Sequence, residues 1–143
     1  MVPHPPLIVP EIGRGEEKKI QSTIDAYREA AERIGAWKPD TIVLLTPHQV
    51  MYADYFHISP GARAEGDFGQ FRAGQVKLTA EYDAAFSELL CQFADGAHVP
   101  AGTLGEKEKR LDHGTMVPLY FINQYWTGYR LVRIGLSGLP LTE

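Results

Sequence analysis

The chain has 143 residues, 44% of them hydrophobic, and its 14 basic and 18 acidic side chains give a formal net charge of −4. This charge excludes a nucleic-acid partner held mainly through phosphate contacts, because such a partner needs a basic face. No apolar run reaches the roughly 18 residues of a membrane-spanning helix, and the lone Cys91 excludes an internal disulfide framework. We therefore expect one soluble, cytoplasmic domain, without a signal peptide because Pro3, Pro5, Pro6 and Pro10 interrupt the N-terminus.

Helical and strand-like patterns alternate along the chain. Apolar residues at helical spacing predict a helix over Glu16–Ile34. The next run, Thr41–Thr46, is short and apolar without alternation, which is typical of a buried strand in a parallel sheet. A second strand is predicted over Asp54–Ser59. Thr79 is a suitable N-cap for a helix over Ala80–Ala94.

The last third of the chain continues this alternation. A short strand is predicted over His98–Ala101 and a final one over Tyr129–Ile134. Between them we predict a helix over Thr115–Tyr125, whose start is fixed near residue 113 because Pro118 is tolerated in a first turn. The pattern favours a three-layer α/β/α fold with a mostly parallel central sheet. Stretches rich in proline, glycine or charge are predicted to be loops or turns: 1–10, 11–15, 60–75 and 102–110.

Three of the five histidines occupy positions suited to binding a ligand. Neighbouring prolines hold the backbone of His4 rigid. His48 follows the carboxyl end of the strand that ends at Thr46, and ligands of open α/β sheets bind at such ends. His113 lies at a loop-to-helix junction beside Asp112, which could tune the imidazole. Each of these histidines, taken alone, is more readily explained as polar surface.

Other polar candidates have simpler explanations. Asp112 has the position and chemistry of an N-cap. His57 is expected to face solvent or a polar pocket, and neither His57 nor His98 is expected to be functional. Cys91 lies beside an apolar helical stripe and is expected to be a buried, inert thiol. The aromatic residues between 120 and 129 suit the core and its rim, or the wall of an aromatic pocket.

Three segments together resemble a known family. They are Pro3–Gly13, Thr46–His48 with Asp54–Phe56 after it, and Leu111–Tyr120, which contains Asp-His-Gly-Thr. Their order and spacing resemble the class III extradiol ring-cleavage dioxygenase (LigB-like) superfamily. Within it, they are similar to the branch related to the AmmeMemoRadiSam and Memo proteins.

The resemblance implies a non-haem Fe(II) centre held by two histidines and a glutamate. His4 and His48 match the histidine ligands, and His113 matches an acid–base histidine whose turn is fixed by Asp112 and Gly114. The implied substrates are a small catechol-type aromatic compound and O₂. Two imidazoles suit Zn(II) as well as Fe(II).

The resemblance also implies that residues 1–143 form a partial version of this domain. The strand that precedes the proline-rich segment in the family, and the family's downstream glutamate, have no counterpart in this sequence. Sheet edges left free in this way favour a homo-oligomer. The alternative function is a catalytically inactive, Memo-like binding or accessory domain of a radical-SAM system, which would use the same pocket without oxygen chemistry.

Overall fold

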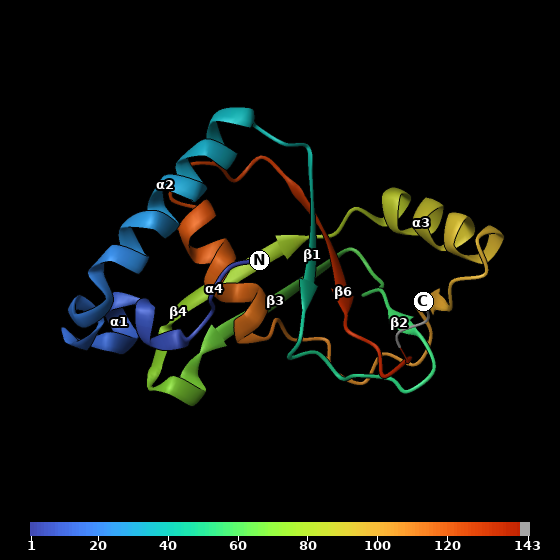
Figure 1. Ribbon diagram of the computed structural model, residues 1–143, viewed down its shortest axis with the longest axis horizontal. Coiled ribbons are helices and arrows are strands. Elements are labelled where there is room, and N and C mark those ends of the chain that lie inside the picture. Colours follow the sequence, from blue (N-terminus) through green and yellow to red (C-terminus); the bar gives the residue numbers. More distant parts are fainter. Residues whose placement is uncertain (141–143) are drawn as a thin grey trace.

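The computed structural model describes residues 1–140, and its elements alternate between helices and strands (Figure 1). The α-helices are α1 (Pro10–Gly13), α2 (Gln21–Trp37), α3 (Ala84–Gly96) and α4 (His113–Ile122). The 3-10 helices are η1 (Pro6–Ile8), η2 (Glu16–Ile20) and η3 (Gly69–Phe71). The strands are β1 (Thr41–Thr46), β2 (Phe56–His57), β3 (Arg63–Phe68), β4 (Ala73–Glu81), β5 (Ala101–Gly102) and β6 (Arg130–Gly135).

The strands pair in three short sheets. β1 and β6 are parallel over their whole length, from Thr41 opposite Arg130 to Thr46 opposite Gly135. β2 and β5 are also parallel, whereas β3 and β4 form an antiparallel hairpin. Isolated bridges connect β6 to the end of β4 and to the residue after β2. The expected α/β class with parallel strand pairs is confirmed.

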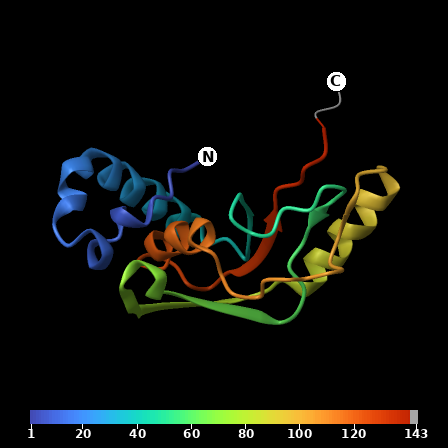
Figure 2. The same ribbon diagram turned by 90° about the horizontal axis from the view of Figure 1, so that it is seen from below.

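The core lies around α4, which is packed between α2 and the strands (Figures 1 and 2). Eight of its residues are buried, so this helix is apolar on nearly all sides. The Tyr27 ring of α2 stacks on the Phe121 ring of α4, with ring centroids 4.5 Å apart. α4 is therefore a rigid element, and the groups at its N-terminus have fixed positions.

β1 has the predicted bounds but is not buried on both faces. Ile42 and Leu44 pack against the core, whereas Val43 and Leu45 are 45% and 55% exposed. The prediction of a fully buried strand was wrong, because no element within residues 1–140 covers the second face of β1. The strand nevertheless ends at the predicted residue, Thr46.

The N-terminal region is more helical than predicted. Residues 1–10 and 11–15 were expected to be looped or turned, but they contain η1 and α1. Proline begins each of these short helices, because its fixed φ suits a first helical turn. The helix predicted over Glu16–Ile34 is divided into η2 and α2, and α2 continues to Trp37.

The glycine-rich residues 60–75 were predicted to be a loop, but most of them belong to the β3–β4 hairpin. Thr79 and Ala80 lie in β4, so the helix predicted over Ala80–Ala94 begins later. Asp83, rather than Thr79, caps α3, since its side chain accepts a hydrogen bond of 3.0 Å from the Phe86 N–H. The apolar stripe of α3 is largely exposed.

The remaining predictions differ only in detail. Residues 102–110 are loop except for Gly102, and the strand predicted over His98–Ala101 is shifted to β5. α4 is shorter than the predicted Thr115–Tyr125 helix, and Pro118 lies in its second turn rather than its first. β6 matches Tyr129–Ile134 to within one residue. No helix within residues 1–140 combines the length and apolar character needed to cross a membrane.

Candidate metal and catalytic site

Three histidines from distant parts of the chain meet at one place. The Nε2 atoms of His4 and His48 face each other 2.9 Å apart. The ring of His113 lies against that of His48, with centroids 3.9 Å apart, and its centroid is 6.1 Å from that of His4. The structure therefore brings together the three histidines that the sequence singled out.

His4 is positioned by buried residues that follow it in its own segment. His4 precedes η1, and Ile8 and Val9 anchor this segment with no exposed surface. The Nδ1 atom of His4 lies 3.4 Å from the carbonyl oxygen of Val2. A proton on Nδ1 leaves Nε2 bare, which is the state that binds a metal ion.

The carboxylate of Asp112 fixes the junction between β1 and α4. It accepts hydrogen bonds from the Thr115 N–H at 3.0 Å, the Thr115 hydroxyl at 3.0 Å and the Thr46 hydroxyl at 2.6 Å. Thr46 also accepts from the His48 N–H at 3.2 Å. The N-cap interpretation of Asp112 is confirmed, and its donors keep this carboxylate directed at the helix terminus.

Gly114 allows this junction to close. A Cβ atom there would lie 2.6 Å from the Thr46 hydroxyl oxygen, 2.9 Å from His48 Cδ2 and 3.0 Å from Asp112 Oδ1. These distances are shorter than ordinary van der Waals contact. Glycine is required here because the end of β1 and the first turn of α4 approach too closely for a side chain.

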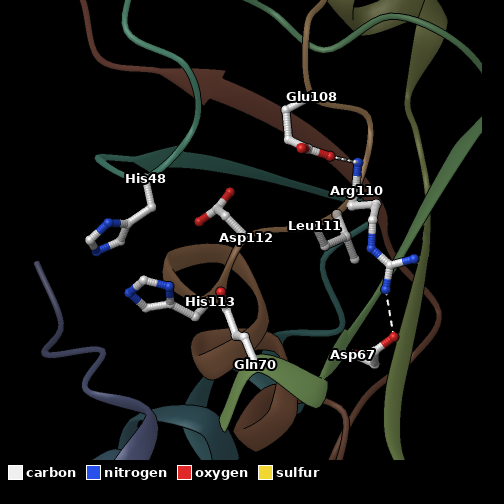
Figure 3. A pocket seen from close by; sticks show the side chains of 8 residues that line it. All are labelled: His48, Asp67, Gln70, Glu108, Arg110, Leu111, Asp112 and His113. Atoms are coloured by element: carbon white, nitrogen blue, oxygen red, sulfur yellow. Dashed lines mark hydrogen bonds and ion pairs between the residues drawn. The ribbon is translucent and has the colours of Figure 1, made fainter. Parts of the chain in front are cut away.

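A pocket of about 450 Å³ opens beside His48 and His113 (Figure 3). On its far side the Arg110 guanidinium donates to Asp67 at 2.5 Å, and the Arg110 N–H donates to Glu108 at 2.9 Å. The pocket is lined by His48, Asp67, Gln70, Glu108, Arg110, Leu111, Asp112 and His113.

The surroundings of His113 favour its neutral form. Burial lowers the pKa of this imidazole below its ordinary value, and the nearby His48 and His4 rings lower it further. Asp112 acts in the opposite direction, but its effect is smaller than those of burial and of His48. The ring of Phe71 meets His113 edge-on, with centroids 5.5 Å apart.

The other polar candidates lie outside the three-histidine cluster. His57 is 1% exposed and its Nδ1 atom lies 2.9 Å from the Gln49 amide nitrogen, within a buried polar cluster. His98 is exposed in the loop after α3. Cys91 is only half-buried rather than buried as expected, and burial raises the pKa of its thiol. The aromatic residues 120–129 lie in the core and its rim, and none of them lines the pocket.

Sequence reasoning missed two residues that support this site, Phe71 and Arg133. Arg133 has no exposed surface and donates to the backbone carbonyls of Glu108 and Arg110, two residues that line the pocket. A charged residue in a strand is ordinarily exposed, so no sequence signal indicated its burial. Phe71 lay in a segment predicted to be loop.

An α/β fold that gathers three histidines beside a pocket is suited to binding a metal ion and a small substrate. The family described as catalytic LigB subunit of aromatic ring-opening dioxygenase matches residues 1–142, and the chain belongs to this family. A curated relative, Protein CA_C1420 of Clostridium acetobutylicum, is 37% identical over 150 residues. The match covers 100% of this chain and 32% of the relative, so the chain spans about a third of that protein's length.

Two of the histidines fit the metal dependence that is general in this family. Two nitrogens bound at right angles to one metal ion, each at about 2.1 Å, lie about 3.0 Å apart. The Nε2 atoms of His4 and His48 are 2.9 Å apart. Within residues 1–140, no group of three or more His, Cys, Asp or Glu side chains is arranged to hold a metal ion. The described residues therefore present two imidazole nitrogens at a spacing that suits one metal ion, without a third such group.

Replacement of Gly114 tests the junction. We expect Gly114→Ala to lower the free energy of unfolding by about 1–3 kcal/mol, because the added methyl group must displace Thr46, His48 or Asp112. Chemical denaturation measures this loss. Gly96→Ala is the matched control, since no atom lies within 4 Å of a Cβ atom there. Equal stability of the two variants would contradict the close approach.

The buried His57 predicts a loss of stability in acid. Burial is the main cause that lowers the pKa of this ring in the folded protein. Below about pH 6.5 the unfolded chain binds a proton that the folded chain excludes, so stability falls until the lower, folded pKa is passed. His113 contributes in the same direction.

Thermal unfolding between pH 7.5 and pH 5 measures this effect. His57→Asn should reduce the acid-induced fall in Tm, whereas His98→Asn, at an exposed position, should leave the fall unchanged. An identical pH dependence in wild type and His57→Asn would show that His57 does not contribute to it.

Proposed function

We propose that this protein is a non-haem Fe(II)-dependent extradiol dioxygenase that opens a catechol-type ring with O₂. The observation that carries the proposal is the meeting of His4, His48 and His113 beside the 450 Å³ pocket. Membership of the LigB family supports this class of reaction. A pocket of this volume is large enough for a single substituted aromatic ring.

The proposed ligands of the metal ion are the Nε2 atoms of His4 and His48. Bound Fe(II) would supply a coordination sphere that holds a catecholate and O₂ together. The resemblance leads us to expect a glutamate as third ligand, but no carboxylate of residues 1–140 completes the set. Zn(II) also binds paired imidazoles, so the identity of the metal is part of the test.

His113 is the proposed acid–base residue. Its ring lies beside that of His48 and lines the pocket, within reach of a substrate that occupies it. An imidazole nitrogen there can accept a proton from a catechol hydroxyl and later return it to the product. Asp112 would act by holding the helix terminus that carries His113 rather than by transferring a proton itself.

Anaerobic titration with Fe(II), followed by exposure to air with a panel of catechols, tests the proposal. We expect His4→Ala and His48→Ala to weaken metal binding by at least about 100-fold. His113→Gln should retain the metal and lower the rate of O₂ uptake by about 10²–10⁴-fold. His98→Ala is the control, because this exposed residue lies outside the cluster.

The alternatives give different results. Iron binding that is absent, or that is unchanged in His4→Ala and His48→Ala, would contradict the metal site. Binding of iron and catechol by the wild-type protein without O₂ uptake would favour a Memo-like binding domain instead of a dioxygenase.

A further inference from the structure

Arg133 is a charged side chain with no exposed surface, at the centre of β6. Its neighbours along the strand, Leu131, Val132 and Ile134, are apolar. Burial of a guanidinium is unfavourable unless its donors are satisfied and its charge is balanced. The partners of Arg133 therefore show what its burial achieves.

The Arg133 guanidinium donates hydrogen bonds to two backbone carbonyl groups as well as to a side chain. Its Nη1 donates to the carbonyl oxygen of Arg110 at 2.8 Å, and its Nη2 donates to that of Glu108 at 3.2 Å. Its Nε donates to the Ser59 hydroxyl at 2.7 Å, which secures the other edge of the group. The Arg133 side chain on β6 therefore holds the loop that contains Glu108 and Arg110 at two backbone positions.

Two carboxylates balance the charge. Arg133 Nη2 lies 3.9 Å from Glu106, and Nη1 lies 3.8 Å from Asp112. Both of these side chains are nearly buried, with 11% and 9% of their surface exposed. Besides Ser59 and the Tyr82 ring, over which the guanidinium lies at 6.0 Å, the four partners of Arg133 lie in residues 106–112, which we name the pocket wall.

The pocket wall has no helix or strand to hold its shape. It nevertheless supplies Glu108, Arg110, Leu111 and Asp112 to the lining of the pocket and leads directly into His113 (Figure 3). Other hydrogen bonds join the wall to β3 and β1: the Leu111 N–H donates to the Glu65 carbonyl at 3.0 Å, the Arg110 guanidinium donates to Asp67, and Asp112 accepts from the Thr46 hydroxyl. Arg133 therefore provides the connection from this wall to β6.

We propose that Arg133 is a positioning residue for the substrate pocket. It fixes the pocket wall relative to the sheet and, through Asp112, the N-terminus of the helix that carries His113. The catalytic consequence rests on the proposed function, but the position of the wall and the affinity of the pocket do not require turnover. His4 lies on another segment, and Thr46, which supports His48, bonds Asp112 Oδ1 rather than the Oδ2 that faces Arg133. Both histidines should therefore keep their metal affinity when Arg133 is replaced.

The experiment compares Arg133→Lys and Arg133→Met with Arg130→Met, an exposed arginine on the same strand. Hydrogen exchange of residues 106–112 reports the wall. Binding of 4-nitrocatechol to Zn(II)-loaded protein reports the pocket, and Zn(II) titration reports the metal ligands. Where the wild type turns over catechols with Fe(II), KM and kcat are measured as well.

We expect Arg133→Met to accelerate exchange in the wall and to weaken 4-nitrocatechol binding, each by about tenfold or more. Arg133→Lys should restore part of both, because an ammonium keeps the charge but cannot reproduce the forked contacts. Zn(II) affinity should change by less than about threefold, and KM should rise more than kcat falls.

The proposal is overturned if hydrogen exchange of residues 106–112 is no faster in Arg133→Met than in Arg130→Met. A parallel loss of metal affinity, ligand affinity and Tm would also overturn it, since that pattern marks general unfolding. Should Arg133→Met fail to fold, Ser59→Ala leaves the guanidinium in place, removes only the hydroxyl that accepts from Arg133 and Gln49, and must still accelerate exchange in residues 106–112. Failure of wild-type protein to bind 4-nitrocatechol counts against the proposed function alone, because the exchange comparison still decides the role of Arg133.

Discussion

The hydrogen bond from the Thr46 hydroxyl to the Asp112 carboxylate joins the end of β1 to the start of α4, and the site depends on this connection. Thr46 also accepts from the backbone of His48, and Asp112 caps the helix that begins at His113. The same pair of side chains therefore sets the positions of two histidines that lie far apart in the sequence. Charge-assisted hydrogen bonds of this kind are short, strong and directional.

Support for the site comes from opposite sides of the molecule. The buried residues Ile8 and Val9 hold the segment that places His4 beside the C-terminal end of β1 and the N-terminus of α4. Arg133, on β6, holds the pocket wall through hydrogen bonds to its backbone. The histidines themselves remain partly accessible, because the described residues cover the site on only some of its sides. A rigid frame with an accessible centre is the arrangement expected of a site that must admit both a metal ion and a substrate.

Local chemistry explains which features could be predicted from the sequence. β1 and the helix start at Asp112 have strong signals, a short apolar run and an N-cap, and the histidines follow from their places at these ends. The β3–β4 hairpin had no such signal, because glycine and alanine at its buried positions, among them Ala64 and Gly66, obscure the alternation of a strand. The burial of Arg133 could not be predicted, since it depends on carbonyl groups far away in the sequence.

The central claim is that the histidine cluster is a metal site whose ligands include His4 and His48. A crystal structure of the protein soaked anaerobically with Fe(II), with anomalous data collected at the iron edge, tests it most directly. The account predicts an iron peak within about 2.2 Å of the Nε2 atoms of both residues, beside the ring of His113. An iron peak at another place, or no iron peak after a soak with excess Fe(II), would contradict it.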